Sequence, residues 1–89
     1  MAEPSRFFGI IIRMFAEHGG RHHTPHFHAV YQEHEAVFTI NPVQILSGSI
    51  PIKQQRLVEA WAEIHQEELQ AAWNALDGGK KPSSIQPLR

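Results

Sequence analysis

The chain has 89 residues and a formal net charge of −1, with eight Lys and Arg against nine Asp and Glu. This is the length of one domain, and so balanced a charge excludes the positive field expected of a general nucleic-acid or membrane-surface binder. Cysteine is absent, which excludes disulfides, thiolate metal sites and a cysteine nucleophile. No apolar run approaches the ~20 residues of a membrane span, and the first residues lack the pattern of an export signal. We therefore expect a single cytoplasmic domain over residues 1–89, with no membrane contact.

Strand patterns occupy the first half of the chain. The segment Arg6–Phe15 is rich in β-branched and aromatic residues and predicts one strand, with Phe8 on the same face as Ile10 and Met14. A loop with a Gly pair follows, and then His26–Tyr31 and Glu35–Ile40 predict the two strands of a hairpin. The stretch 44–50 predicts a weaker fourth strand because it contains a glycine. Together these segments predict a small antiparallel sheet of three to four strands.

The second half of the chain predicts one long helix. From about residue 53 to residue 77, apolar residues recur every three or four positions, which is the spacing of one helix face. That face consists of Leu57, Val58, Trp61, Ile64, Leu69, Ala72 and Leu76. Gly78–Gly79 end the pattern, and a short extended tail occupies residues 78–89. The expected fold is therefore α+β, with strands over about residues 6–50 packed on a single helix.

The predicted first strand leaves large apolar side chains without cover. One helix covers one face of a sheet, so either Phe7, Ile11 and Phe15 or the residues that alternate with them stay exposed. Exposed apolar patches of this kind mark interaction surfaces. We therefore expect a homodimer or a complex with a cognate protein partner, and we expect nucleic acid less because of the balanced charge.

Histidine is the residue in excess, with seven copies, six of them before the predicted helix. His26 and His28 are two apart on a predicted strand, so their side chains leave the same face ~7 Å apart and can ligate one ion. His65 and Glu68 project from the apolar side of the predicted helix and can complete a site for zinc or a similar divalent metal. The remaining histidines lie on adjacent loops: His18, His22, His23 and His34.

A structural interpretation of the same four residues stands beside the metal site. Strand histidines such as His26 and His28 are often half-buried and hydrogen-bonded to neighbouring groups, without any ligand. His65 and Glu68 then form a hydrogen-bonded pair that fixes how helix and sheet fit together, because an unpaired buried polar group costs ~1–3 kcal/mol.

These residues support two hypotheses from different classes of function. The first is a non-enzymatic binding module that acts through a protein partner. The second is a metal- or histidine-dependent hydrolase of a phosphodiester such as RNA. There the four side chains activate the nucleophile and Arg6 or Arg13 binds the phosphate. The two hypotheses are distinguished by whether the four side chains meet within ~4 Å of one point that opens to solvent.

Several motifs occur in an order that resembles a known family. They are H-x-x-PHFHA-x-Y at residues 22–31, G-x-I-P at Gly48–Pro51, W-x-x-x-H-x-x-E-L in the predicted helix and I-x-PL at Ile85–Leu88. This combination resembles the small bacterial proteins grouped as domain of unknown function 4160, with Thr24 in place of that family's usual first proline. The matching positions are Pro25, His26, Phe27, His28, Tyr31, Trp61, His65, Glu68, Leu69 and Trp73.

What the resemblance implies is a small stand-alone bacterial protein, often encoded beside another small domain of unknown function. Such an arrangement indicates a toxin–antitoxin-like or regulatory gene pair, which favours the binding module over the hydrolase.

Overall fold

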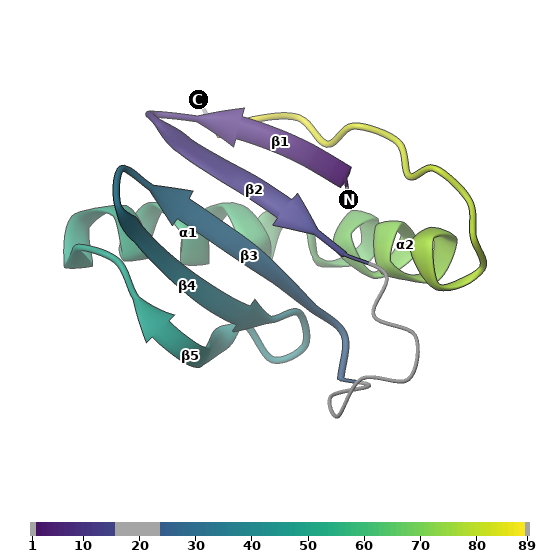
Figure 1. Cartoon of the computed structure of the whole chain (residues 1–89), viewed down its shortest axis with the longest axis horizontal. Helices are drawn as coiled ribbons and strands as arrows, with labels where there is room; N and C mark the ends of the chain where they lie inside the picture. The colour runs from purple at the N-terminus through teal and green to yellow at the C-terminus, as the bar shows by residue number, and fades with distance from the viewer. Residues whose placement is uncertain (1, 16–23, 89) are drawn as a thin grey trace.

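The computed structural model describes residues 2–15 and 24–88, which form an α+β fold as predicted. Its strands are β1 (Ala2–Phe7), β2 (Ile10–Met14), β3 (His26–Tyr31), β4 (His34–Thr39) and β5 (Gln44–Ser49). They form one antiparallel sheet in which strand order follows chain order. Two helices, α1 (Ile52–Ile64) and α2 (Gln66–Asp77), lie on one side of the sheet (Figure 1). Neither helix is long and apolar enough to cross a membrane.

The predicted first strand is in fact two strands joined by a tight turn. Phe8 and Gly9 form that turn with positive φ angles of 48° and 77°. This backbone closes a two-residue hairpin with the twist that its strands require. Because the chain reverses here, Phe8 is exposed at the hairpin tip. The prediction that Phe8 shares a face with the buried Ile10 is therefore wrong. The sheet therefore has five strands, where three to four were expected, and it begins at Ala2.

The last strand, β5, is bulged against β4. The pairing register shifts between Val37 and Phe38, where Leu46 is the extra residue on β5. Two residues further on, Gly48 pairs with Ala36 and has a φ of +74°. A Cβ at residue 48 would overlap the backbone carbonyl oxygen of Glu35. Glycine is therefore required here both by the backbone conformation and by the close approach of the two strands. Gly48 is therefore a structural requirement of this strand.

The predicted single helix is two helices that meet at His65. Its backbone has φ −111° and ψ 26°, which lies outside the helical range. Next to it, the side chain of Gln66 donates a hydrogen bond to the carbonyl of Ile40 at 3.0 Å, which ties the break to the turn after β4. Ile64 and Glu68 are exposed, whereas the unbroken helix predicted from the sequence placed both on the buried side.

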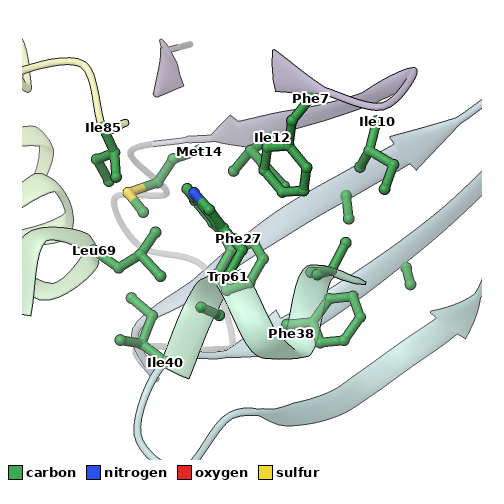
Figure 2. Close-up of a cluster of buried hydrophobic side chains, with 14 of the residues drawn as sticks. Phe7, Ile10, Ile12, Met14, Phe27, Phe38, Ile40, Trp61, Leu69 and Ile85 are labelled. Atoms are coloured by element: carbon green, nitrogen blue, oxygen red, sulfur yellow. The ribbon is translucent and has the colours of Figure 1, made fainter. Parts of the chain in front are cut away.

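The hydrophobic core lies between the helices and the facing side of the sheet. Trp61 of α1 is at its centre, with its ring centroid 5.1 Å from that of Phe7 and 6.0 Å from that of Phe27 (Figure 2). Phe27 in turn stacks on Phe38 of the neighbouring strand, with centroids 5.4 Å apart. Leu69 of α2 packs into the same cluster. One continuous core therefore joins strands β1 to β4 to both helices.

The tail after α2 is held against both layers. Ile85 is buried, and its N–H donates to the carbonyl of Pro4 in β1 at 2.8 Å. The Nε1–H of Trp61 donates to the backbone carbonyl of Gln86, also at 2.8 Å. In Figure 1 the tail runs beside β1, so it covers the outer edge of the first strand.

Candidate functional site

The side of the sheet that faces away from the helices carries two rows of side chains. Residues paired on neighbouring strands share a face of the sheet. From β1 to β5, the first row is Arg6, Ile11, Val30, Glu35 and Ser49, and the second row is Arg13, His28, Val37 and Ser47. We call these nine residues the open face, because no helix in residues 2–15 and 24–88 covers them (Figure 1).

His28 lies in the middle of the second row. Its Nδ1 is 2.9 Å from Oε2 of Glu35, and a carboxylate only accepts, so Nδ1 carries the hydrogen and donates it. The ring packs edge-on against Phe15, with centroids 4.7 Å apart. Its other nitrogen, Nε2, is buried and has no hydrogen-bond partner among the described residues. The nitrogen that would act as a base or a metal ligand is therefore closed off from solvent.

His26 lies at the start of β3, where the sheet meets α2. It is buried, and its Nδ1–H donates to the backbone carbonyl of Thr24 at 2.8 Å. Its ring centroid is 5.0 Å from that of Trp73 on α2 and 5.5 Å from that of His28. These contacts give His26 a packing role between the sheet and the second helix.

His65 and Glu68 form a second pair at the break between the helices. The Nδ1–H of His65 donates to Oε1 of Glu68 at 2.6 Å, and the ring lies 5.6 Å from that of Trp61. Both residues line a shallow hollow of about 250 Å³ at this break. The side chain of Glu68 is 51% exposed there, whereas that of His65 is 15% exposed and packs on Trp61. The pair is therefore only partly buried, not fully buried as the sequence suggested.

The four predicted site residues thus lie in two pairs. His28 points to the open face, whereas His65 packs on Trp61, whose ring contacts the buried Phe27 on the helix side of the sheet. Within ranges 2–15 and 24–88, no group of three or more His, Cys, Asp or Glu side chains is arranged to hold a metal ion. The arrangement therefore offers two His–carboxylate hydrogen bonds and no shared centre.

In the part of the chain that the structure describes, the other histidines do not join either pair. His34 lies on β4, with its Nε2 3.8 Å from the carboxylate of Glu33. His18, His22 and His23 lie outside the described residues.

Glu35 is the residue of this surface that the sequence analysis missed. A two-residue turn at 32–33 fixes the register of the hairpin, so Val30 pairs with Glu35 and His28 pairs with Val37. Glu35 is therefore the diagonal neighbour of His28 on the same face, within side-chain reach. Counting residues outward from the polar turn would have identified this pair.

The β1 end of the open face carries an exposed ion pair. Arg6 donates to both carboxylate oxygens of Glu3, at 3.0 and 3.3 Å. These hydrogen bonds hold the pKa of Glu3 below its usual value, and the charge of Arg13 acts in the same direction. The same contact raises the pKa of Arg6. The open face therefore carries Arg6 on β1, beside the carboxylate of Glu3, Arg13 on β2 and Glu35 on β4.

Comparison with models of known protein families gives a match. The family model described as Domain of unknown function (DUF4160) matches residues 9–74, from the first hairpin turn into α2. The matched range includes all four predicted site residues. No curated protein and no solved structure matches the chain.

Proposed function

The chain belongs to the family of domain of unknown function 4160, and from this premise we propose that it is a non-enzymatic binding module that acts through a protein partner. In this proposal it is the regulatory component of a bacterial, toxin–antitoxin-like gene pair and works in the cytoplasm. The partner is the product of the adjacent gene, and it binds by adding a strand to β5.

The observation that carries this proposal is the free edge of β5. It is the last strand of the sheet, and no described segment pairs with its outer side. A free edge offers a row of N–H and C=O groups to a further strand. The sequence of β5, QILSGS, contains no charged residue and no proline, and Leu46 is 45% exposed. Apart from its bulge, this edge lacks the features that keep other strands from pairing with it.

The opposite edge of the sheet is protected by several features at once. Pro4 interrupts the donors of β1, the tail bonds to it through Ile85, and Glu3 and Arg6 place charges on the strand. The chain therefore shields one edge and leaves the other open, which supports β5 as the place where a partner strand adds.

The geometry gives less support to the hydrolase. A hydrolytic centre needs a base or a bound metal with access to substrate. The free nitrogen of His28 is buried, and His65 belongs to a separate pair on the helix side. The proposal therefore assigns the strand histidines to packing.

Two matched lysine variants test the proposal. Leu46→Lys and Ile64→Lys each place a lysine at an exposed apolar position, 45% and 68% exposed, but only the first lies on the β5 edge. The protein is coexpressed with the product of the adjacent gene, and the affinity of the purified complex is measured by calorimetry. We expect Leu46→Lys to weaken binding about tenfold or more, because a charge on a pairing edge opposes strand addition, and Ile64→Lys to leave it unchanged.

Two results would count against this interpretation. If Leu46→Lys binds like the unmodified chain, the partner uses another surface. If no complex forms under any condition, the adjacent gene product is not the partner.

A further inference from the structure

We propose that the open face is a second interaction surface, on which another copy of this chain docks face to face in a symmetric dimer. This inference is independent of the partner proposed for β5, because it uses the face of the sheet and leaves the β5 edge free.

The first row of the open face has the pattern that a symmetric dimer requires. Across four neighbouring strands it reads basic, apolar, apolar, acidic: Arg6, Ile11, Val30 and Glu35. When the same row of a second copy lies on it in the opposite strand order, Arg6 faces Glu35 and Ile11 faces Val30. A two-fold axis parallel to the strands, between β2 and β3, produces this reversal, and a two-fold interface brings the same patch of both copies together.

The distances suit such a pairing. Arg6 and Glu35 lie three strand intervals apart, roughly 14 Å, so they stand on either side of the axis at equal distances from it. Packed sheets lie ~10 Å apart. The side chains of Arg6 and Glu35 are 61% and 53% exposed, and together they are long enough to span that gap.

The existing partners of both charges leave room for the new contact. Arg6 uses Nε and Nη2 for Glu3, so Nη1 is the nitrogen that reaches Glu35 of the second copy. Glu35 uses one carboxylate oxygen for His28, and its other oxygen accepts from that arginine. Each dimer therefore gains two such ion pairs without breaking the contacts within each chain.

The middle of the surface supplies the apolar contact. Ile11 and Val30 pair directly across β2 and β3 and are half-buried, as is Val37 in the second row. In the dimer, Ile11 of each copy covers Val30 of the other and removes both from water. A face of this size, about 20 Å by 20 Å from strand spacing and length, is smaller than the ~800 Å² per partner of a standard interface. We therefore expect a weak dimer with a dissociation constant in the micromolar range.

The order of charges favours a second copy over an unrelated protein. A heterologous partner has to supply its own acidic, apolar and basic groups in the matching order. This chain already supplies that order to itself.

Charge exchange tests the proposal directly. Sedimentation velocity from low to high micromolar concentration gives the dimer dissociation constant for the unmodified chain, Arg6→Glu, Glu35→Arg and the variant with both changes. We expect each single reversal to weaken the dimer about tenfold, because two ion pairs become two repulsions. The double variant restores the pairs with exchanged signs and recovers the original dissociation constant. Recovery separates this mechanism from a local structural loss, since damage at either site would not be repaired by the other change.

Two controls accompany these variants. Arg56→Glu breaks the exposed pair of Arg56 with Glu59 on α1, which has the same spacing as the Arg6–Glu3 pair. This variant also replaces an arginine by a glutamate, but at a site outside the open face. We expect it to leave the dimer dissociation constant unchanged. Leu46→Lys also leaves it unchanged, because the β5 edge is not used.

The proposal is overturned if the chain stays monomeric at the highest concentration. It is also overturned if a dimer forms that ignores both reversals, or that Leu46→Lys dissociates, because the contact then lies elsewhere. The first two results say nothing about binding of the adjacent gene product, so the two proposals can fail separately. A dimer that Leu46→Lys dissociates would instead show that a second copy uses the β5 edge and competes there with the adjacent gene product.

Discussion

His28 uses only one of its two ring nitrogens. Nδ1 donates to Glu35, while Nε2 is buried with no partner among the described residues. A buried polar atom without a hydrogen bond costs ~1–3 kcal/mol, so the imidazole here gives up stability that an apolar ring would keep. The favourable part of the residue is its ring, which packs on Phe15.

Two substitutions of His28 separate the ring from its nitrogens. His28→Phe keeps an aromatic ring on Phe15 and removes the unsatisfied nitrogen, so we expect the free energy of unfolding to stay the same or rise by up to ~1 kcal/mol. His28→Ala removes the ring as well and should lower it by about 2 kcal/mol. Urea unfolding of both variants measures the difference. A large loss in His28→Phe would show that hydrogen bonding by the imidazole, at Nδ1 to Glu35 or at Nε2, contributes more than the buried nitrogen costs.

At the scale of the elements, local signals located β3 and β4 to within a residue. These signals are Pro25, the strand-forming residues that follow it, and the polar turn before β4. Each of them spans only a few neighbouring residues, so no knowledge of the rest of the fold is needed. The break at His65 was not visible in the sequence, because the helical spacing of apolar residues continues across it. The first hairpin was missed because phenylalanine rarely occupies a turn position with a positive φ, as Phe8 does here.

The glycine in β5 yields a prediction at the same scale. Gly48 and Gly79 have nearly the same φ, +74° and +77°, but a Cβ at residue 48 would overlap the carbonyl of Glu35, whereas at residue 79 no atom lies within 4 Å. Gly79→Ala therefore has only the cost of a left-handed backbone, about 1–2 kcal/mol. Gly48→Ala has that cost and the overlap, and should lower the free energy of unfolding by ~3 kcal/mol or more. Equal losses in the two variants would mean that β5 moves away from β4 at little cost.

At the scale of the whole molecule, the candidate site could be predicted only in part. Spacing alone put His26 and His28 on one strand and His65 one turn from Glu68, and the structure has both relations. The sequence could not say which face of the sheet the helices cover, because Ile11 and Ile12 are apolar on opposite sides of β2. The side of the sheet that the helices cover separates the strand histidines from the His65–Glu68 pair. That side is decided by the packing of the complete chain.

The tail shows the same dependence on the complete fold. It buries Ile85, bonds to β1 and accepts a hydrogen bond from the central Trp61. Deletion of residues 85–89 removes a buried side chain and leaves the indole N–H of Trp61 without its acceptor. We expect the free energy of unfolding to fall by about 3 kcal/mol or more in urea unfolding.

Gln86→Ala is the matched control for this deletion, because the acceptor of the indole N–H is the backbone carbonyl and survives the substitution. It should change the free energy of unfolding by less than about 0.5 kcal/mol. The deletion also uncovers the outer edge of β1, so the shortened chain should associate through that edge at concentrations where the full chain does not. An unchanged stability after deletion would mean that the tail lies on the fold without supporting it. The protection of β1, and with it the contrast between the two edges of the sheet, would then rest on Pro4 and the Glu3–Arg6 pair alone.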